Sequence, residues 1–150
     1  AAQLDLARQI SNMMEMSFGA YNEVESLQTA LVEREKSLAA KAQAKEAIDA
    51  AKLLEKELAE IKDGTTEVAG FGAVNRDLAR FLSMAEVGDV RPAESLQSAA
   101  RQACESLGKV MERWRKVNTE TLPALNKLLK QNNLAPLPAP TIQAAIAPCS

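Results

Sequence analysis

Residues 94–117 read ESLQSAARQACESLGKVMERWRKV, and apolar side chains recur in this stretch alternately four and three positions apart. This seven-residue period places them on one stripe of an α-helix and is typical of long helices that pack nearly parallel to one another. The stripe consists of Leu96, Ala100, Ala103, Leu107, Val110, Trp114 and Val117. The stretch therefore predicts a long helix in an all-α bundle.

A second long helix is expected over residues 3–40, where the same spacing continues. Its stripe consists of Leu6, Ile10, Met13, Ser17, Ala20, Val24, Leu27, Leu31, Arg34 and Leu38. Ser17 and Arg34 interrupt this stripe. A polar residue at such a position often sets the register of packed helices or faces a wetter contact.

Two shorter helices complete the predicted bundle. We expect a tight turn at residues 41–45, because one unbroken helix of about 60 residues would leave its partners too short to cover it. A helix over 46–62 then ends at Asp63-Gly64, and residues 65–73 form a connection. The next helix buries Val74, Leu78, Phe81, Leu82 and Ala85 and ends at Gly88-Asp89, and Pro92 opens the helix that follows.

The end of the chain is rich in proline. Pro123 is expected to interrupt the last long helix, with Thr119 or Thr121 capping a short continuation that Asn132-Asn133 closes. The predicted architecture is an antiparallel, up-down bundle of about four helices in one domain, residues 1–133. Residues 134–150 form a proline-rich tail that is extended or mobile.

Composition supports this fold and excludes several classes of protein. Of 150 residues 27 are alanine and only 3% are aromatic, which favours helices and argues against an all-β fold. The net charge of −2 provides no overall positive field for nucleic acid. No apolar run approaches the length of about 20 residues that spans a bilayer. Histidine is absent, so di-iron, zinc and histidine-dependent catalytic sites are not expected.

The remaining candidates for chemistry have simpler structural explanations. Gly70-Phe71-Gly72 lacks the further residues of a phosphate-binding loop. Met13, Met14 and Met16 are expected to fill gaps in the core rather than bind copper. Five carboxylates alternate with basic residues and predict a solvated face: Glu33, Glu35, Glu55, Glu57 and Glu60. One basic patch is formed by Arg113, Arg115, Lys116, Lys127 and Lys130, but a nucleic-acid surface is not expected, because only Trp114 could stack on bases and it lies on the apolar stripe. We therefore expect no catalytic residue, cofactor or metal.

Two stretches of the sequence resemble a known protein family. One is VNRDLARFL at 74–82, continued by GDVRP at 88–92. The other is WRKVN at 114–118, continued by LPALN at 122–126 and LAPL at 134–137. Together they resemble the C-terminal helical region of bacterial sortilin-like, Asp-box β-propeller proteins, a group often described as glycosyl hydrolase-like.

This resemblance implies an accessory module of an exported protein. In that family the propeller carries any ligand or sugar site, and this sequence lacks the Asp-box signature, so no hydrolase activity is expected of it. The most specific part of the resemblance makes Trp114, Pro123 and Asn126 candidates for a structural or interaction anchor. Trp114 is either a core residue at the helix end or an exposed docking residue.

Cys104 and Cys149 permit one disulfide. About 42 Å of helix separates Cys104 from Asn132, and the 16 residues from Asn133 to Pro148 extend to about 53 Å, so the tail is long enough to return. Export of the protein would permit such a bond. In the alternative, Cys104 fills space in a half-buried groove and Cys149 is free on a mobile tail.

The function expected from these observations is that of a non-catalytic helical accessory or interaction domain. Its partner would be the N-terminal propeller of its own chain, another protein, or a second copy in a weak homodimer, in the periplasm or outside the cell. The alternative is a small carrier that opens its Met- and Leu-rich stripe around an apolar ligand.

Overall fold

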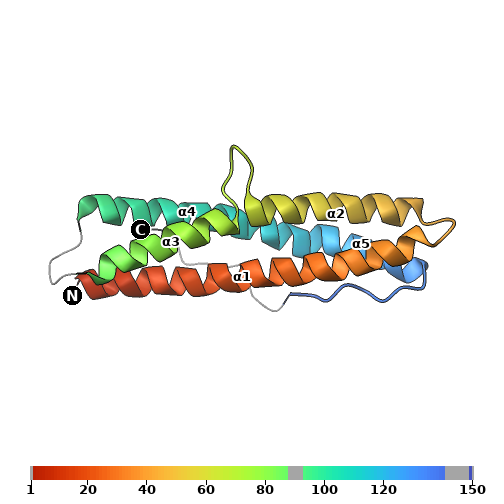
Figure 1. Ribbon diagram of the computed structural model, residues 1–150, viewed down its shortest axis with the longest axis horizontal. Helices are drawn as coiled ribbons and strands as arrows, with labels where there is room; N and C mark the ends of the chain where they lie inside the picture. The colour runs from red at the N-terminus through yellow and green to blue at the C-terminus, as the bar shows by residue number, and fades with distance from the viewer. Residues whose placement is uncertain (1, 88–92, 141–148, 150) are drawn as a thin grey trace.

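The computed structural model describes residues 2–87, 93–140 and 149, and all regular secondary structure in these residues is helical (Figure 1). The helices are α1 (Ala2–Ala39), α2 (Lys45–Asp63), α3 (Phe71–Glu86), α4 (Glu94–Lys116), the short π-helix η1 (Val117–Thr121) and α5 (Leu122–Gln131). The predicted all-α bundle is confirmed. The turn between the first two helices is also confirmed, because α1 ends before residue 40 and α2 begins at residue 45.

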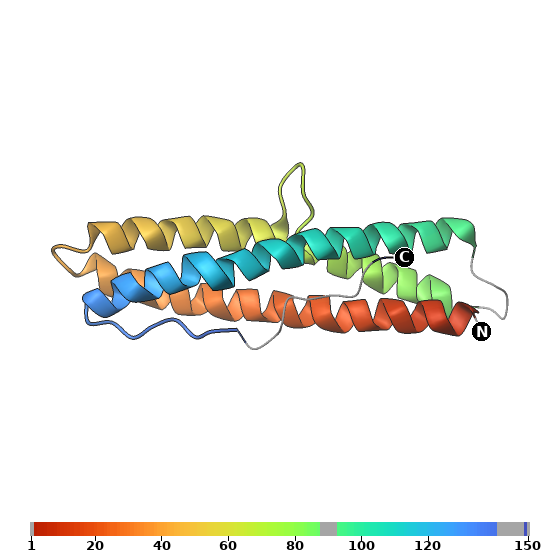
Figure 2. The ribbon, with the colours of Figure 1, turned by 180° about the vertical axis from the view of Figure 1, so that it is seen from behind.

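The helices form an elongated bundle in which α2 and α3 lie end to end. Both run antiparallel to α1, and the line formed by α4, η1 and α5 returns along the whole length (Figures 1 and 2). α1 packs on α2 and α3, α3 packs on α4, and α2 packs on α5. Each half of the bundle therefore contains three helices, and α2 and α3 together match the length of α1.

The core follows the predicted apolar stripes. All seven stripe positions of residues 94–117 are buried, from Leu96 at 7% exposure to Trp114 at 0%. In α1 the stripe residues Ile10, Ala20, Val24, Leu27, Leu31 and Leu38 are buried as well. Burial of such a continuous stripe removes apolar surface from water along the whole bundle, which is the main stabilising term for helices of this kind.

Gly64 and Gly70 join α2 to α3 at a point of close backbone contact. A Cβ atom on Gly70 would lie 2.4 Å from the Gly64 nitrogen, and one on Gly64 would lie 2.6 Å from the Gly70 nitrogen. Gly64 also has a φ of +82°, which disfavours any other residue. The chain can thus leave α2, form the exposed loop at 65–69 and return to the same line to begin α3.

The third helix begins earlier than the sequence predicted. α3 starts at Phe71, inside the predicted connection 65–73, because Gly70 adopts an extended conformation at its N-cap and the Phe71 side chain is fully buried. The predicted helix end at Gly88-Asp89 and the predicted helix opening at Pro92 lie outside the described residues.

The predicted interruption at Pro123 is confirmed for the α-helix, which ends at Lys116 and begins again at Leu122, but the π-helix η1 keeps the chain helical between them. η1 contains one extra residue per turn, and the Leu122 N–H donates to the Val117 carbonyl, five residues back. Proline lacks an N–H group and crowds the carbonyl four residues before it, so the wider turn accommodates the ring. Neither predicted cap forms: the Thr119 hydroxyl donates to the Arg115 carbonyl, and the Thr121 hydroxyl donates to Glu57 of α2.

The predicted end at Asn132-Asn133 is confirmed by the geometry of the turn. Asn133 has a φ of +60°, its N–H donates to the Lys130 carbonyl, and the Leu134 N–H donates to the Leu129 carbonyl. This pair of hydrogen bonds is the Schellman motif, in which a left-handed residue closes the helix. The turn directs the tail back along the bundle.

We predict that Gly70→Ala destabilises the protein by about 1 to 3 kcal/mol, because the added methyl group overlaps the backbone of Gly64. Gly72→Ala is the matched control, since its Cβ would come no closer than 3.3 Å to the Lys62 carbonyl oxygen. Urea unfolding followed by circular dichroism measures both. Equal losses in the two variants would show that the contact between the glycines is not the constraint.

Candidate functional site

The tail is held against the bundle by Arg34, one of the two polar residues that interrupt the stripe of α1. The Arg34 Nε donates to the Ala135 carbonyl oxygen at 2.8 Å, and its Nη2 donates to that of Pro136 at 3.3 Å. The guanidinium thus spans two successive backbone carbonyls with its fixed fork of donors. Arg34 therefore interrupts the apolar stripe of α1 at the point where α1 contacts a segment 101 residues further along the chain.

Asn126 of α5 binds the next residue of the tail from the other side. Its Oδ1 accepts from the Leu137 N–H at 2.7 Å, and its Nδ2 donates to the Leu137 carbonyl oxygen at 3.2 Å. The Leu137 side chain is only 2% exposed. Asn126, which the resemblance had made an anchor candidate, therefore anchors this segment of the tail.

The tail segment lies against both α1 and α5, and we call the surface that it covers, which includes Arg34 and Asn126, the groove. No Cα atom of α1 lies within 8 Å of one of α5 along these two fully described helices, so they are not in direct backbone contact. Arg34 comes from the first helix and Asn126 from the second, and the segment between their hydrogen bonds runs back along the bundle (Figure 2). Leu134 and Leu137 pack against the core. The first part of the predicted tail, residues 134–137, is thus attached to the bundle.

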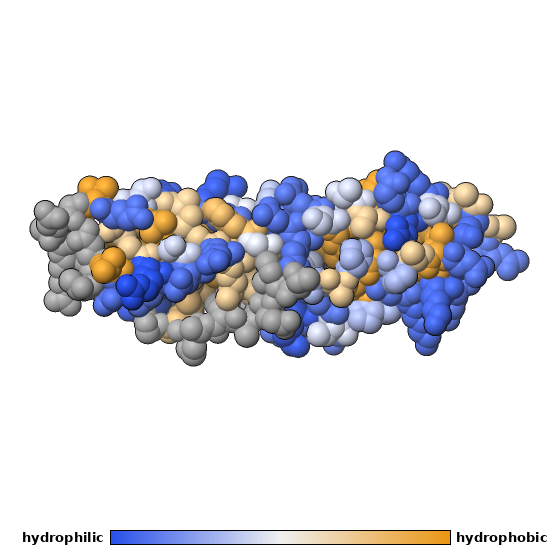
Figure 3. Space-filling model, turned by 90° about the horizontal axis from the view of Figure 1, so that it is seen from below, coloured by the Kyte–Doolittle hydropathy of each residue, from blue (hydrophilic) through white to orange (hydrophobic). Residues whose placement is uncertain are grey.

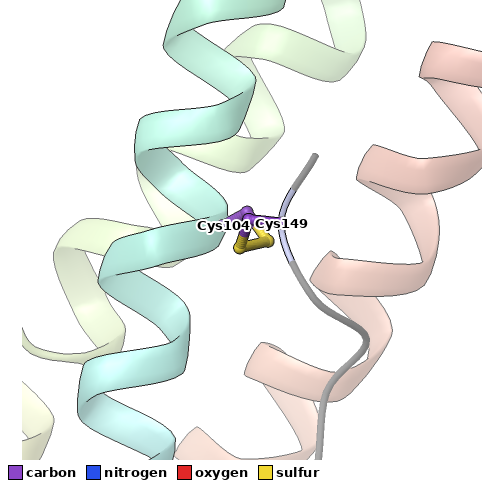
Figure 4. Close-up of a disulfide and its surroundings, with 2 residues drawn as sticks. All are labelled: Cys104 and Cys149. Carbon is purple, nitrogen blue, oxygen red and sulfur yellow. A yellow bond between two sulfur atoms is a disulfide. The ribbon is translucent and has the colours of Figure 1, made fainter.

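A disulfide joins the tail to the bundle a second time. Cys104 of α4 is bonded to Cys149, with 5.8 Å between their Cα atoms (Figure 4). Of the two alternatives that the sequence left open, the structure has the bridged one. Residues 141–148, between this bond and the groove, lie outside the described part of the tail.

Trp114 and Asn118 bring two polar atoms without partners into the interior. Trp114 lies in the core rather than at the surface, and its Nε1 and the Asn118 Oδ1 are buried and make no hydrogen bond within the described structure. One helical turn separates the two residues, at the point where α4 passes into η1. Pro123, the third anchor candidate, is exposed on the first turn of α5 and touches none of the tail hydrogen bonds described above.

Ser17, the other interruption of the α1 stripe, is fully buried and bonded to a neighbouring helix. Its hydroxyl donates to the Oδ1 of Asn75 in α3. A buried hydroxyl needs such a partner, because an unpaired one costs about 1 to 3 kcal/mol. Ser17 therefore aligns α1 with α3, whereas Arg34 aligns α1 with the tail.

The carboxylates predicted to form a solvated face are only partly solvated. Glu33 pairs with Lys36 at the surface, as expected. The other four contact a neighbouring helix: Glu35 and Glu55 contact each other, Glu57 accepts from Thr121, and Glu60 pairs with Arg113 at 2.9 Å. These positions flank the apolar stripe at the boundary between helices, which the alternation of charges along one helix does not reveal.

The contact between Glu35 and Glu55 changes the protonation of a carboxyl group. The pKa of Glu35 is raised from 4.5 to about 7. Partial burial is the largest cause, the hydrogen bond to Glu55 and its negative charge add to it, and Lys52 opposes it. The raised pKa means that the Glu35 carboxyl, at the interface of α1 and α2, keeps its proton up to near neutral pH.

The structure also places the remaining candidate residues from the sequence. Met13, Met14 and Met16 are half-buried against the core. Arg113 and Arg115 of the basic run bind Glu60 and Glu112. In the described ranges, no group of three or more Cys, Asp or Glu side chains is placed to hold a metal ion. Over the same residues no helix combines the length and hydropathy needed to cross a membrane.

Comparisons with protein-family models, with curated proteins and with solved structures find no match to this chain.

We predict that Glu35→Gln changes how stability depends on pH. A carboxyl whose pKa is raised in the folded state contributes stability below pH 4.5, and this contribution is lost as the pH rises through about 7. The wild-type free energy of unfolding should therefore fall between these values, and the variant should lack this fall and be the more stable protein at pH 8. Glu33→Gln, at an exposed pair on the same helix, should behave as the wild type.

We predict that replacing Cys104 and Cys149 by serine lowers the free energy of unfolding by at most about 4 kcal/mol. This is the chain-entropy value for a closed loop of about 46 residues. Thermal unfolding of the variant and of the reduced wild type should agree. Titration of thiols in denatured, unreduced protein should find none, and two free thiols in protein from an oxidising compartment would contradict the bond.

Proposed function

We propose that this chain is a non-catalytic helical interaction module of a larger exported protein. One observation carries the proposal: large apolar side chains remain exposed where α1 begins and α3 ends. Leu4 is 60% exposed, Met84 54% and Val87 75%. Figure 3 shows apolar side chains at this end, at the left, among hydrophilic ones, and others in the right half of the molecule. Exposed apolar side chains that come from two packed helices at one end of a bundle support a contact surface there.

The disulfide supports export. Bonds of this kind form and persist in oxidising compartments and are rare in the cytosol. The resemblance to the helical region of sortilin-like proteins supports a neighbouring β-propeller as the partner of the exposed end. The reading frame of the source gene tests this part directly: it should encode Asp-box repeats before residue 1, and a frame without them would contradict the propeller.

One observation favours the alternative, a carrier of a small ligand. A bound molecule with one donor and one acceptor would satisfy both Trp114 Nε1 and Asn118 Oδ1, which are buried without partners. Native mass spectrometry of protein purified from its host distinguishes the two functions. A retained small molecule would support the carrier, and its absence together with association through the exposed end would support the interaction module.

We predict that the isolated chain is a monomer in equilibrium with a weak dimer, and that Val87→Glu abolishes the dimer. The substitution places a charge in an apolar contact, where desolvation is unfavourable. Light scattering over a range of concentrations measures the average mass. Leu53→Glu is the matched control, since Leu53 is 55% exposed on α2, away from this end. A stable trimer or tetramer, or the same loss in both variants, would contradict the proposal.

A further inference from the structure

The groove between α1 and α5 holds its occupant by the peptide backbone. The four hydrogen bonds that join Arg34 and Asn126 to the tail all involve backbone atoms of Ala135, Pro136 and Leu137: three are donated by the side chains, and one is donated by the Leu137 N–H. The Leu137 side chain is the one part of this triplet that is buried. The recognition therefore requires an extended backbone and one large apolar side chain, and it makes little use of the other side chains.

The sequence of the occupant suits this form of recognition. Pro136 and Pro138 flank Leu137 and restrict the backbone to extended conformations, which lowers the entropy lost on binding. Leu137 retains the N–H group that Asn126 accepts from, which a proline at this position would lack. A separate polypeptide with an extended backbone and a leucine between two prolines would have the same N–H and carbonyl groups. It could therefore make the same hydrogen bonds to Arg34 and Asn126 and bury the same leucine side chain.

Arg34 and Asn126 make more contacts with the tail than are needed to keep the tail attached to the bundle. Arg34 stands at a stripe position where an apolar residue would pack, and its donors face the tail. The amide group of Asn126 makes two hydrogen bonds to Leu137, one through its oxygen and one through its nitrogen. The chain already returns through the Schellman turn and is already fixed by the disulfide, and Arg34 and Asn126 bind the backbone of residues 135–137 in addition.

We propose that this groove is a docking site for an extended peptide with the pattern Pro-Leu-Pro, and that the tail occupies it as an internal ligand. The inference rests on the proposed interaction role but uses a different surface from the exposed end at Leu4, Met84 and Val87. A tethered segment acts at an effective concentration of about a millimolar. An external peptide therefore binds only when the internal segment is weakened, and the disulfide helps to keep that segment in place.

The test uses the full chain and a labelled peptide with the sequence of residues 134–140, LAPLPAP. Leu137→Ala, combined with serine in place of both cysteines, weakens the internal ligand. Fluorescence anisotropy should show saturable binding to this chain, at least about tenfold tighter than to the wild type. A peptide with alanine in place of the leucine between its prolines should bind at least about tenfold more weakly, because the buried side chain is lost.

Substitutions in the groove separate docking from nonspecific association. In the weakened chain, Asn126→Ala should abolish saturable binding, and Asn22→Ala, at an exposed position of α1, should leave it unchanged. Far-UV circular dichroism confirms that each variant is folded. Absence of saturation in the folded, weakened chain, or equal binding of the two peptides, would overturn the inference. If Val87→Glu still abolishes dimers in that case, the proposed function stands and only the peptide site fails.

Discussion

The structure depends on matching a long apolar stripe with a partner of equal length. α1 has 38 residues, and its stripe can be buried along its whole length only if the opposing surface is equally long. The chain meets this constraint with two helices in line rather than one. The close contact of Gly64 and Gly70 makes this possible, because it brings the end of α2 and the start of α3 together. α4 and α5 can then pack along the composite surface.

Much of this fold follows from local patterns. The heptad spacing predicted the long helices. The turn before residue 45 was predicted because a single unbroken helix would be too long for its partners to cover. The π-helix that keeps the chain helical before Pro123 was missed because a proline normally ends a helix, and only the spacing of the stripe reveals the alternative. Val117 and Leu122, both buried, are five residues apart instead of three or four, which requires one extra residue in the turn.

The groove was harder to predict because its parts are distant in the sequence. Arg34 was recognised as an irregularity, and Asn126 was noticed through a resemblance, but nothing local links either residue to Leu137. The contacts arise from tertiary structure: the gap between α1 and α5, the direction set by Asn133, and the extended backbone that alternate prolines impose. The sequence shows a polar break in one stripe and a leucine between two prolines, but it does not connect the two.

The disulfide also determines how the molecule would respond to a pulling force. Tension applied between the two ends of the chain would pass from Cys149 directly into the middle of α4 through the bond to Cys104. The 45-residue span that the bond closes, which includes η1, α5 and the tail segment at 134–137, would carry no load while the bond is intact. Reduction would add about 150 Å of extensible chain and would expose α5 and the groove to the same force.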